Sequence, residues 1–393
     1  MTLLSGLLTG FSALLALPTA VFFIEIVAAR LLPKRRIMAG GQRPRVAVLI
    51  PAHNEAAGLR PTLEDVKAQL RNSDRLLVVA DNCTDETASV AASSGAETTA
   101  RSDQAKIGKG YALDWGLNYL AADAPDIIIM VDADCRLNPG AIDQLATVCA
   151  ELQRPVQSLY LMTASAGSPV NHQVAEFAWR VKNLVRPMGL AALGLPCQLM
   201  GSGMAFPWHV IRSTNLSTGY IVEDLKLGLE LAATGHPPIF CPSAVVTSTF
   251  PNSAEGAKTQ RQRWEHGHIG LMILKGPTLL YQAFRHRDLN LLALVLDILV
   301  PPLSLLGAIL IAITLVAGVA ALIGIATIPF YISLICLALV VIATMLAWSR
   351  HGRDILPPSS FGLLALYFIM KLRHYGGALL GRRISRWIRA DRS

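Results

Sequence analysis

The chain has 393 residues, of which 52% are apolar and only 16% are charged. Its mean hydropathy of +0.44 is too high for an ordinary soluble domain. The same composition excludes an intrinsically disordered chain, which needs few apolar residues and many charges. The composition therefore indicates a protein that is partly embedded in a membrane.

The positive charge is confined to two short flanks. Lys and Arg outnumber Asp and Glu by 35 to 27, which gives a formal net charge of +8. Residues 30–45 and residues 371–393 each carry a net charge of +6, so the rest of the chain carries −4. Both flanks adjoin apolar runs, and we expect them to face anionic lipid. This distribution indicates a membrane protein and not a nucleic-acid-binding protein.

The first apolar run covers residues 7–32 and contains only two charged residues, Glu25 and Arg30. As a helix that rises about 1.5 Å per residue, it crosses ~30 Å of hydrocarbon. Basic residues follow the run and none precedes it, which is the reverse of a cleaved signal peptide. We therefore expect residues 1–34 to be an uncleaved anchor, with the N-terminus outside and the basic residues from Lys34 in the cytoplasm.

Residues 44–250 alternate between short apolar runs and helical patterns. Strands are expected at residues 45–51, 75–80 and 126–131, and helices at residues 56–70, from Thr84 onward, and at residues 109–120. Strands that alternate with helices form parallel βαβ units with right-handed crossovers. The five cysteines of this region follow no CxxC or Cys/His zinc spacing, and we expect reduced thiols. The pattern predicts a cytoplasmic α/β domain that binds ligands at the carboxyl ends of its strands.

Acidic side chains follow three of the expected strands. Glu55 follows the first, Asp81 the second, and Asp132 and Asp134 the strand at residues 126–131. Carboxylates crowded at one edge repel one another unless a cation lies among them, and this spacing suits a divalent ion held mainly by a substrate diphosphate. A solvated turn is the alternative interpretation of an isolated Asp-x-Asp. Because the glycine patterns of dinucleotide-binding, Walker and nucleophile-elbow loops are missing from the sequence, dinucleotide enzymes and hydrolases are excluded.

Further polar candidates lie between these strands and the second apolar region. Asp224 follows Glu223 at the expected start of a helix, where the helix dipole favours a carboxylate. Gln260, Arg263 and Trp264 lie together in one short segment. An arginine grips a diphosphate bidentately, and a tryptophan offers a flat face to a sugar ring. The structural alternatives are a helix cap for the aspartate, a surface ion pair for the arginine, and a membrane-interface anchor for the tryptophan.

The second apolar region covers residues 289–349, and Asp297 is its only charge before Trp348. Its length exceeds one crossing and suits two transmembrane helices, separated near residues 318–329. Pro301 and the proline that follows it are expected to kink the first helix of the pair.

The C-terminal segment covers residues 350–393. Within it, residues 361–380 are apolar but interrupted by basic residues. We favour an interfacial or re-entrant amphipathic helix here, and a fourth crossing is the alternative. With three crossings, residues 34–288 and the basic tail lie on the same, cytoplasmic side.

Six motifs follow one another in the order Pro51-Ala52-His53-Asn54-Glu55, Asp81, Gly108-Lys109-Gly110, Asp132-x-Asp134, Glu223-Asp224 and Gln260-x-x-Arg263-Trp264. In this order, directly ahead of a transmembrane pair, they resemble the membrane-bound family-2 glycosyltransferases, the group that contains cellulose, chitin and hyaluronan synthases. Within that group the chain is most similar to bacterial exopolysaccharide glycosyltransferases, over residues 45–272. The resemblance implies a GT-A-type, Rossmann-like mixed sheet over residues 44–250, interface helices over residues 251–288, and flanking transmembrane helices.

The resemblance also implies a role for each motif residue. On the donor side these are Glu55, Asp81 and Lys109 at the nucleotide, Asp132 and Asp134 with Mg²⁺ or Mn²⁺ at the diphosphate, and Gln260 and Arg263 holding the same diphosphate. On the acceptor side these are Asp224 as general base, Trp264 stacked on the acceptor sugar, and Glu223, Gly201 and Ser202 in contact with the acceptor. For the loop that contains Gly201 and Ser202, packing is an equal alternative. An inverting transfer is a single displacement, so it needs one base on the acceptor side and charge neutralisation on the leaving side.

These features predict a metal-dependent inverting hexosyltransferase of the bacterial inner membrane. It would move a sugar from a UDP-linked donor to a polyprenyl-lipid-linked saccharide in exopolysaccharide synthesis. The alternative is a processive synthase that polymerises and exports a homopolymer. Processive synthases of the resembled group use more crossings to enclose a channel, so three or four crossings favour a single transfer. A catalytically inactive scaffold is the third hypothesis, and the intact set of motif residues argues against it.

Overall fold

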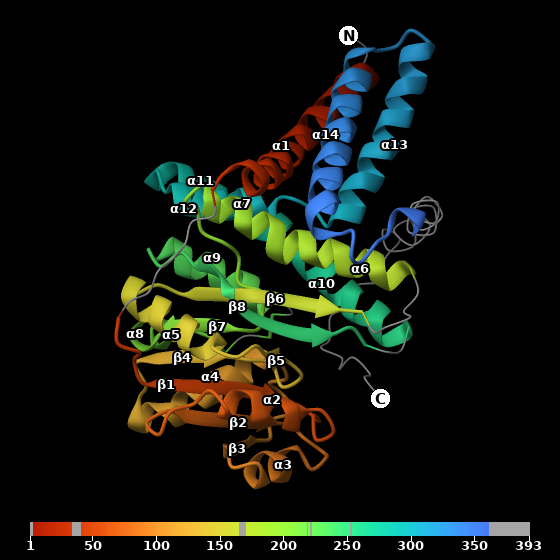
Figure 1. Cartoon of the computed structure of the whole chain (residues 1–393). Coiled ribbons are helices and arrows are strands. Elements are labelled where there is room, and N and C mark those ends of the chain that lie inside the picture. Colours follow the sequence, from red (N-terminus) through yellow and green to blue (C-terminus); the bar gives the residue numbers. More distant parts are fainter. Residues whose placement is uncertain are drawn as a thin grey trace.

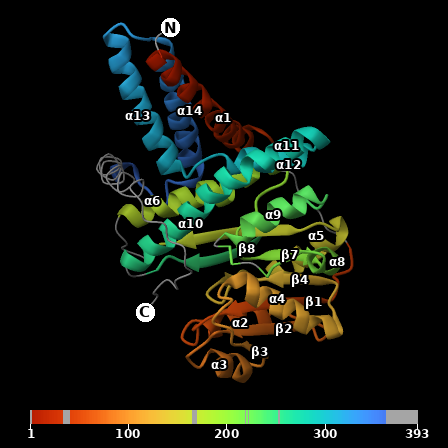
Figure 2. The ribbon, with the colours of Figure 1, turned by 180° about the vertical axis from the view of Figure 1, so that it is seen from behind.

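The computed structural model describes residues 3–33, 41–164, 170–217, 219–220, 222–251 and 254–360. A sheet domain forms one end of the molecule and three long helices form the other (Figure 1). A layer of shorter helices lies between them, and the view from behind shows the same three tiers (Figure 2). The sheet domain and the long helices are therefore joined through this middle layer.

An eight-stranded sheet forms the core of the domain, in the order β3-β2-β1-β4-β7-β6-β8-β5. The strands are β1 (Val46–Ala52), β2 (Arg75–Asp81), β3 (Glu97–Arg101), β4 (Ile127–Met130), β5 (Arg136–Leu137), β6 (Val156–Thr163), β7 (Met204–Pro207) and β8 (Ile239–Thr249). Strands β1 to β4 pair in parallel, β6 is parallel to β8, and β7 runs antiparallel to β4 and β6. The three predicted parallel strands are confirmed, and the sheet as a whole is mixed, as the resemblance implied.

Helices cover both faces of the sheet because its strands are apolar on both sides. On one face lie α2 (Leu59–Lys67), α3 (Thr87–Ser93) and α5 (Ala141–Leu152); on the other lie α4 (Lys109–Leu120), the short turn η1 (Ala121–Asp123), α8 (Trp208–Arg212) and α9 (Glu223–Ala233). Val48 of β1 packs in the first core and Leu49 in the second, as alternate residues of a strand must. Helix α4 has the predicted bounds, whereas α2 and α3 begin three residues later than predicted.

The middle layer contains two groups of helices. One continuous run consists of α6 (Val170–Arg180), the π-helical turn η2 (Val181–Val185) and α7 (Arg186–Ala192). The second group consists of α10 (Ala254–Leu274), α11 (Gly276–His286) and α12 (Leu289–Ile298). Helix α12 packs against α9 of the sheet domain through a shared cluster of buried side chains that includes Leu225 and Leu294. The layer is thus part of the same packed body as the sheet domain beneath it.

Three described helices are long and apolar enough to span a membrane, in agreement with the predicted three crossings. They are α1 (Leu3–Leu31), α13 (Leu303–Leu322) and α14 (Ile328–His351), and α14 is followed by the short turn η3 (Pro358–Ser360). Helices α13 and α14 separate within the predicted break. The predicted amphipathic helix at residues 361–380 and the basic tail lie outside the described residues.

The prediction for Pro301 and Pro302 was wrong. Instead of kinking one helix, they separate two, because α12 ends at Ile298 and α13 begins at Leu303. Proline lacks the backbone N–H that continues a helix, and its ring clashes with the preceding turn. The apolar residues before the prolines therefore belong to the middle layer and not to a crossing.

Part of the first basic flank is also placed differently from the expectation. Arg43 forms ion pairs with Asp74, at 2.7 Å, and with Asp143 inside the domain. Its side chain is 3% exposed, so it does not face lipid. Arg45 pairs with Asp123 and donates a second bond to it at 2.7 Å. These two arginines thus hold the chain in place just before β1. Of the described basic residues in this flank, Arg30 in the last turn of α1 is the one that lies on a long apolar helix.

A buried charge cluster ties helix α1 to the middle layer. Nε of Arg186 lies 2.5 Å from Oε2 of Glu25, and Nη2 lies 2.6 Å from Oδ1 of Asp297. These residues belong to α7, α1 and α12, and all three are buried. Removing one partner of a buried pair leaves an uncompensated charge, which costs ~3–5 kcal/mol. The cluster therefore fixes the spanning helix against the layer that carries the domain.

Replacing Gly189 by alanine should destabilise this contact. A Cβ at Gly189 would lie 1.9 Å from the carbonyl oxygen of Glu25, so α1 and α7 would have to separate. Overpacking of this kind costs about 1–3 kcal/mol, and we expect a lower Tm in detergent. Gly270→Ala in α10 is the matched control, because nothing described lies within 4 Å of its Cβ position. Equal Tm values for the two variants would contradict the close packing of α1 on α7.

Candidate active site

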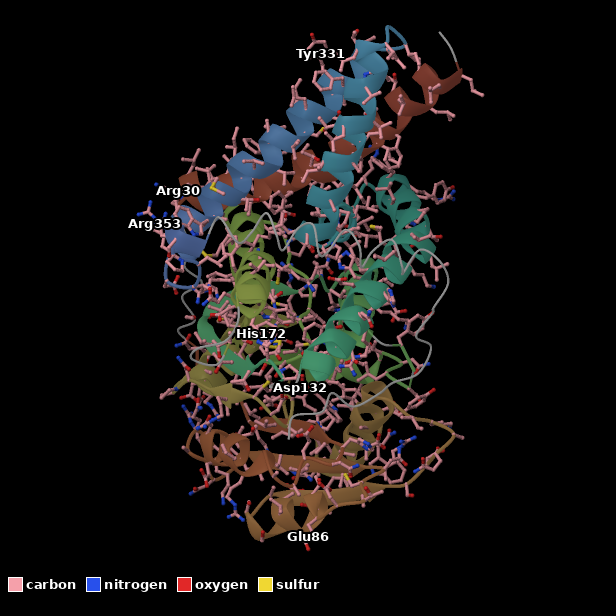
Figure 3. All side chains as sticks on the ribbon, turned by 90° about the vertical axis from the view of Figure 1, so that its right-hand side faces the viewer. Arg30, Glu86, Asp132, His172, Tyr331 and Arg353 are labelled. Carbon is pink, nitrogen blue, oxygen red and sulfur yellow. The ribbon has the colours of Figure 1, made fainter. Side chains whose placement is uncertain are left out.

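A cavity of about 210 Å³ opens at the carboxyl ends of the parallel strands. It is lined by residues from the ends of β1 and β2, the loop after β4, β6, α4, the loop before β7, α6, η2, α9 and α10. Eleven of the twelve predicted site residues line it: Glu55, Asp81, Lys109, Asp132, Asp134, Gly201, Glu223, Asp224, Gln260, Arg263 and Trp264. The twelfth, Ser202, does not. Figure 3 shows Asp132 at the level where the sheet domain meets the middle layer.

The loops after β1 and β2 are joined by the side chain of Asn54. Asn54 has a φ of +54°, in the left-handed region that asparagine tolerates better than most residues. This turn lets its Oδ1 accept the backbone N–H of Thr84 at 2.7 Å. The backbone N–H of Glu55, next in the chain, donates to Oγ1 of Thr87 at 2.8 Å. The local sequence therefore holds the Glu55 wall of the cavity in a fixed position.

Asp81 is paired with an arginine that the sequence analysis did not identify. Nη1 of Arg101 lies 2.5 Å from Oδ1 of Asp81, and both side chains are buried. Arg101 ends β3, and its guanidinium lies 5.4 Å from the ring centroid of Tyr111. The pairing depends on the register of β2 with β3, which no local sequence pattern reveals. Asp81 is thus held rigidly at the cavity wall.

Lys109 lies among the carboxylates of the cavity. Its Nζ is 2.5 Å from Oδ1 of Asp132 and 3.7 Å from Oε1 of Glu223, and it donates to the carbonyl oxygen of Gly201 at 2.7 Å. Burial alone would lower the pKa of Lys109, but Asp132 and Glu223 outweigh it and hold that pKa above its ordinary value. Lys109 therefore neutralises the acidic wall, in addition to the nucleotide-lining position that was predicted for it.

Glu223 and Asp224 begin helix α9 and titrate as a pair. Burial raises the pKa of Glu223 to about 7, although Lys109 opposes the shift. Burial also raises the pKa of Asp224, against the opposing charges of Lys109 and Lys182. A carboxylate in this environment is a better proton acceptor than one in water, because its protonated form is favoured. Both carboxylates are therefore protonated more readily than a carboxylate in water.

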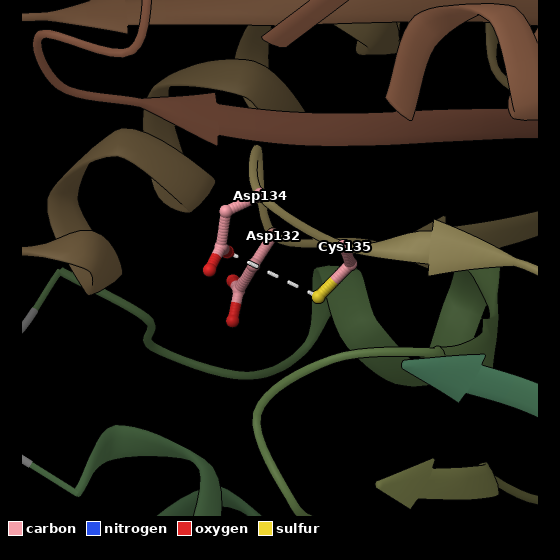
Figure 4. A group of neighbouring side chains, drawn as sticks. All are labelled: Asp132, Asp134 and Cys135. Atoms are coloured by element: carbon pink, nitrogen blue, oxygen red, sulfur yellow. Dashed lines mark hydrogen bonds between the residues drawn. The ribbon is translucent and has the colours of Figure 1, made fainter. Parts of the chain in front are cut away.

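Asp132, Asp134 and Cys135 form a group of potential metal ligands (Figure 4). One ligand atom from each lies within 4.8 Å of the others. Burial raises the pKa of the Cys135 thiol to about 12. The sulfur of Cys135 also accepts a hydrogen bond from the hydroxyl of Ser202 at 3.2 Å. A protonated, buried thiol is a poor ligand for a hard cation, whereas two carboxylates suit Mg²⁺ or Mn²⁺. The donor set therefore fits the predicted ion through Asp132 and Asp134.

Ser202 supports the site from behind and has no exposure to the cavity. It is fully buried, and its Oγ accepts the backbone N–H of Asp132 at 3.0 Å. The structure therefore places Ser202 behind the cavity wall, and not at the cavity surface where contact with an acceptor was predicted. Gly201 does line the cavity, with a φ of +92°, and a Cβ on it would lie 3.3 Å from Oδ2 of Asp224. The glycine thus keeps the space beside Asp224 open.

Helix α10 supplies the wall that faces the middle layer. Gln260, Arg263 and Trp264 lie on one face of it, at the i, i+3, i+4 spacing that brings helical side chains together. Burial lowers the pKa of Arg263, while Glu223 and Asp132 oppose the shift. The Trp264 ring packs on Trp179, with centroids 4.8 Å apart and planes tilted by 39°. One face of Trp264 is therefore covered by protein.

The run through η2 adds residues that the sequence analysis missed. Trp179, Lys182 and Asn183 line the cavity, and Trp179 also meets Tyr160 edge-on at 5.7 Å. Lys182 and Asn183 lie in the π-helical turn, a feature that is frequent at functional sites, and Trp179 lies just before it at the end of α6. Their helical pattern resembles that of any amphipathic helix, so only the turn and its contacts identify them. Together, the cavity places a pair of potential metal ligands, several cations and two carboxylates of raised pKa around one space.

The family model and the related sequences that match this chain both describe glycosyltransferases. The sequence model of the family described as glycosyltransferase like family 2 matches residues 44–267, more than half of the chain. An uncharacterized glycosyltransferase of Mycobacterium bovis, Mb0553, is 30% identical over 194 residues, which cover 42% of this chain and 82% of that protein. The Mycobacterium tuberculosis protein Rv0539, also described as an uncharacterized glycosyltransferase, matches with the same figures.

Two solved structures are also similar. One is the mannosyltransferase PcManGT from Pyrobaculum calidifontis in complex with GDP-Man and Mn²⁺, at 16% identity and a TM-score of 0.49, covering 88% of this chain and 99% of that one. The other is glucosyl-3-phosphoglycerate synthase from Mycobacterium tuberculosis with Mn²⁺, UDP and phosphoglyceric acid, at 22% identity and a TM-score of 0.43, covering 62% and 86%. On the match over residues 44–267 and the 30% identical relatives, this chain belongs to glycosyltransferase family 2.

Proposed function

We propose that this enzyme is a metal-dependent inverting hexosyltransferase of the bacterial inner membrane. It takes a sugar from a UDP-linked donor and adds it to a polyprenyl-lipid-linked saccharide in exopolysaccharide synthesis. The observation that carries the proposal is the shared cavity of Asp132, Asp134 and Asp224. In this proposal, Asp132 and Asp134 serve the donor diphosphate and Asp224 serves the acceptor hydroxyl within the same cavity.

In the proposed reaction the acceptor hydroxyl attacks the anomeric carbon of the donor. Asp224 takes the hydroxyl proton while the new carbon–oxygen bond forms, and the bond to the diphosphate oxygen breaks on the opposite side. The nucleoside diphosphate leaves with the electron pair of that bond, so the configuration is inverted. Mg²⁺ or Mn²⁺ bound by Asp132 and Asp134 would neutralise charge on the leaving diphosphate. Arg263 adds positive charge on the same side of the site, and an arginine is able to bind two diphosphate oxygens.

The acceptor class follows from the position of the site. The wall made by α10 belongs to the middle layer, and the three helices long enough to span a membrane pack on the other side of that layer. Arg30 and Arg353 lie at the end of these helices nearest the domain, and Tyr331 lies near the far end (Figure 3). Basic residues favour the cytoplasmic side of a membrane, which supports a cytoplasmic domain. A site this close to the bilayer suits an acceptor that is anchored in lipid.

Asp224→Asn should abolish turnover while leaving donor binding intact. Loss of a positioned base lowers the rate by ~10²–10⁴-fold, and the amide keeps the shape of the carboxylate. Turnover is measured as release of nucleoside diphosphate, and binding by calorimetry with UDP and Mn²⁺. Glu230→Gln is the matched control on the same helix, because Glu230 pairs with Lys226 outside the cavity. Asp224 is not the base if its asparagine variant turns over at the wild-type rate.

Asp134→Asn should weaken the binding of Mn²⁺ and, through it, the binding of UDP by tenfold or more. The carboxylate is one of the two hard ligands of the group, and an amide oxygen carries no charge to replace it. Calorimetric titration with Mn²⁺, with and without UDP, measures both effects. Glu86→Gln provides the control, since Glu86 is exposed at the far end of the sheet domain (Figure 3). Unchanged Mn²⁺ affinity in Asp134→Asn would remove this residue as a ligand.

A further inference from the structure

A second cavity, of about 360 Å³, lies between the middle layer and the long helices. Its walls come from α6 and η2, from α10, and from α13 and α14. Apart from the residues at the end nearest the active site, the lining is predominantly apolar. Ala178 of α6, Ile311 of α13 and Val341 of α14 are examples from three of its walls. A cavity with apolar walls binds hydrocarbon and not a sugar or a nucleotide.

The second cavity adjoins the active site. Four residues line both spaces: Trp179, Lys182, Gln260 and Trp264. Gln260 and Trp264 belong to the motif assigned to the diphosphate and the acceptor, so the apolar space begins where the polar space ends. At its other end the space lies between α13 and α14, two of the helices that are long and apolar enough to span a membrane. A ligand that occupies both cavities therefore has a polar head and an apolar tail.

Lys182 marks the junction of the two cavities. Its Nζ lies 5.6 Å from the ring centroid of Trp179, and among the described residues no carboxylate forms an ion pair with it. Arg186, one turn further along, is already engaged by Glu25 and Asp297. Burial lowers the pKa of Lys182, with Asp224 opposing the shift. The Lys182 side chain is half-buried, and a partly desolvated ammonium attracts an anion more strongly than one in water, so this cation is placed to bind an anionic ligand.

We propose that the second cavity holds the hydrocarbon chain of the acceptor and that Lys182 binds the phosphate at the head of this chain. The ligand class is a long-chain lipid phosphate, with its sugar directed past Trp264 towards Asp224. This inference rests on the lipid-linked acceptor proposed above and adds where that lipid lies. It assigns the apolar space to substrate and makes Lys182 a specificity-determining residue for the anionic head.

Photolabelling tests the chain site without requiring turnover. The probe is farnesyl phosphate with a diazirine at the end of its chain, added to the purified enzyme in detergent. Thr344→Trp on α14 and Ala178→Phe on α6 fill the cavity from opposite sides and should each reduce labelling at least fivefold. Ile335→Trp is the matched control on α14, because Ile335 is 59% exposed and lies outside the cavity lining. Undiminished labelling in both cavity variants, or an equal loss in Ile335→Trp, overturns the proposal.

A second probe tests the role of Lys182. Lys182→Met should reduce labelling by the farnesyl phosphate probe at least fivefold but leave labelling by the matching farnesol probe unchanged, since only the phosphate needs the cation. Lys182→Arg should restore most of the phosphate-dependent labelling. Equal labelling of Lys182→Met and the wild type by the phosphate probe contradicts the assignment. Calorimetry with UDP and Mn²⁺ on the same samples tests the proposed function separately, because a wild type that labels but binds no UDP would refute that function alone.

Discussion

The site depends on one electrostatic constraint, which is that several carboxylates share a small and largely buried space. Asp132, Glu223 and Asp224 would repel one another there, and Lys109 compensates by contacting the first at 2.5 Å and the second at 3.7 Å. The compensation is incomplete, since burial still raises the pKa of Glu223 to about 7. An acidic space of this kind favours a divalent cation and the diphosphate that comes with it. The same imbalance keeps Asp224 able to accept a proton.

The position of this space relative to the long apolar helices is set by a second buried charge cluster. Arg186 joins Glu25 of α1 to Asp297 of α12, and α12 in turn packs on α9, which carries Asp224. A chain of packed elements therefore connects a long apolar helix to the proposed base. Because Trp179, Lys182, Gln260 and Trp264 line both cavities, the polar space and the apolar space also adjoin each other. For the proposed reaction, this arrangement would let a lipid-linked acceptor reach the site from the side of the long apolar helices.

The sequence predicted the parts of the site that lie at the ends of regular elements. Asp81 and Asp132 follow apolar strands, and Asp224 begins a helix, so local patterns were sufficient to bring them together. Arg101 could not be predicted, because its partnership with Asp81 depends on strand register. Lys182 and its π-helical turn could not be predicted either, since the sequence there has an ordinary helical pattern.

Two further differences have similar physical causes. Ser202 and Gly201 are adjacent in the sequence, but the positive φ of the glycine directs one residue into the cavity and leaves the other buried behind Asp132. The apolar residues before Pro301 read as part of a crossing, because hydropathy does not distinguish a helix buried by protein from one buried by lipid.

The central claim is that the crowded carboxylates form a metal–diphosphate site, and a structure determined with UDP and Mn²⁺ tests it most directly. Anomalous scattering locates the ion without reference to any assumed ligand. The account predicts a manganese peak shared by Asp132 and Asp134, with UDP phosphate oxygens completing its coordination and Lys109 no longer the principal partner of Asp132. A peak ligated by Cys135, or UDP bound in the cavity without an ion between the two aspartates, would contradict it.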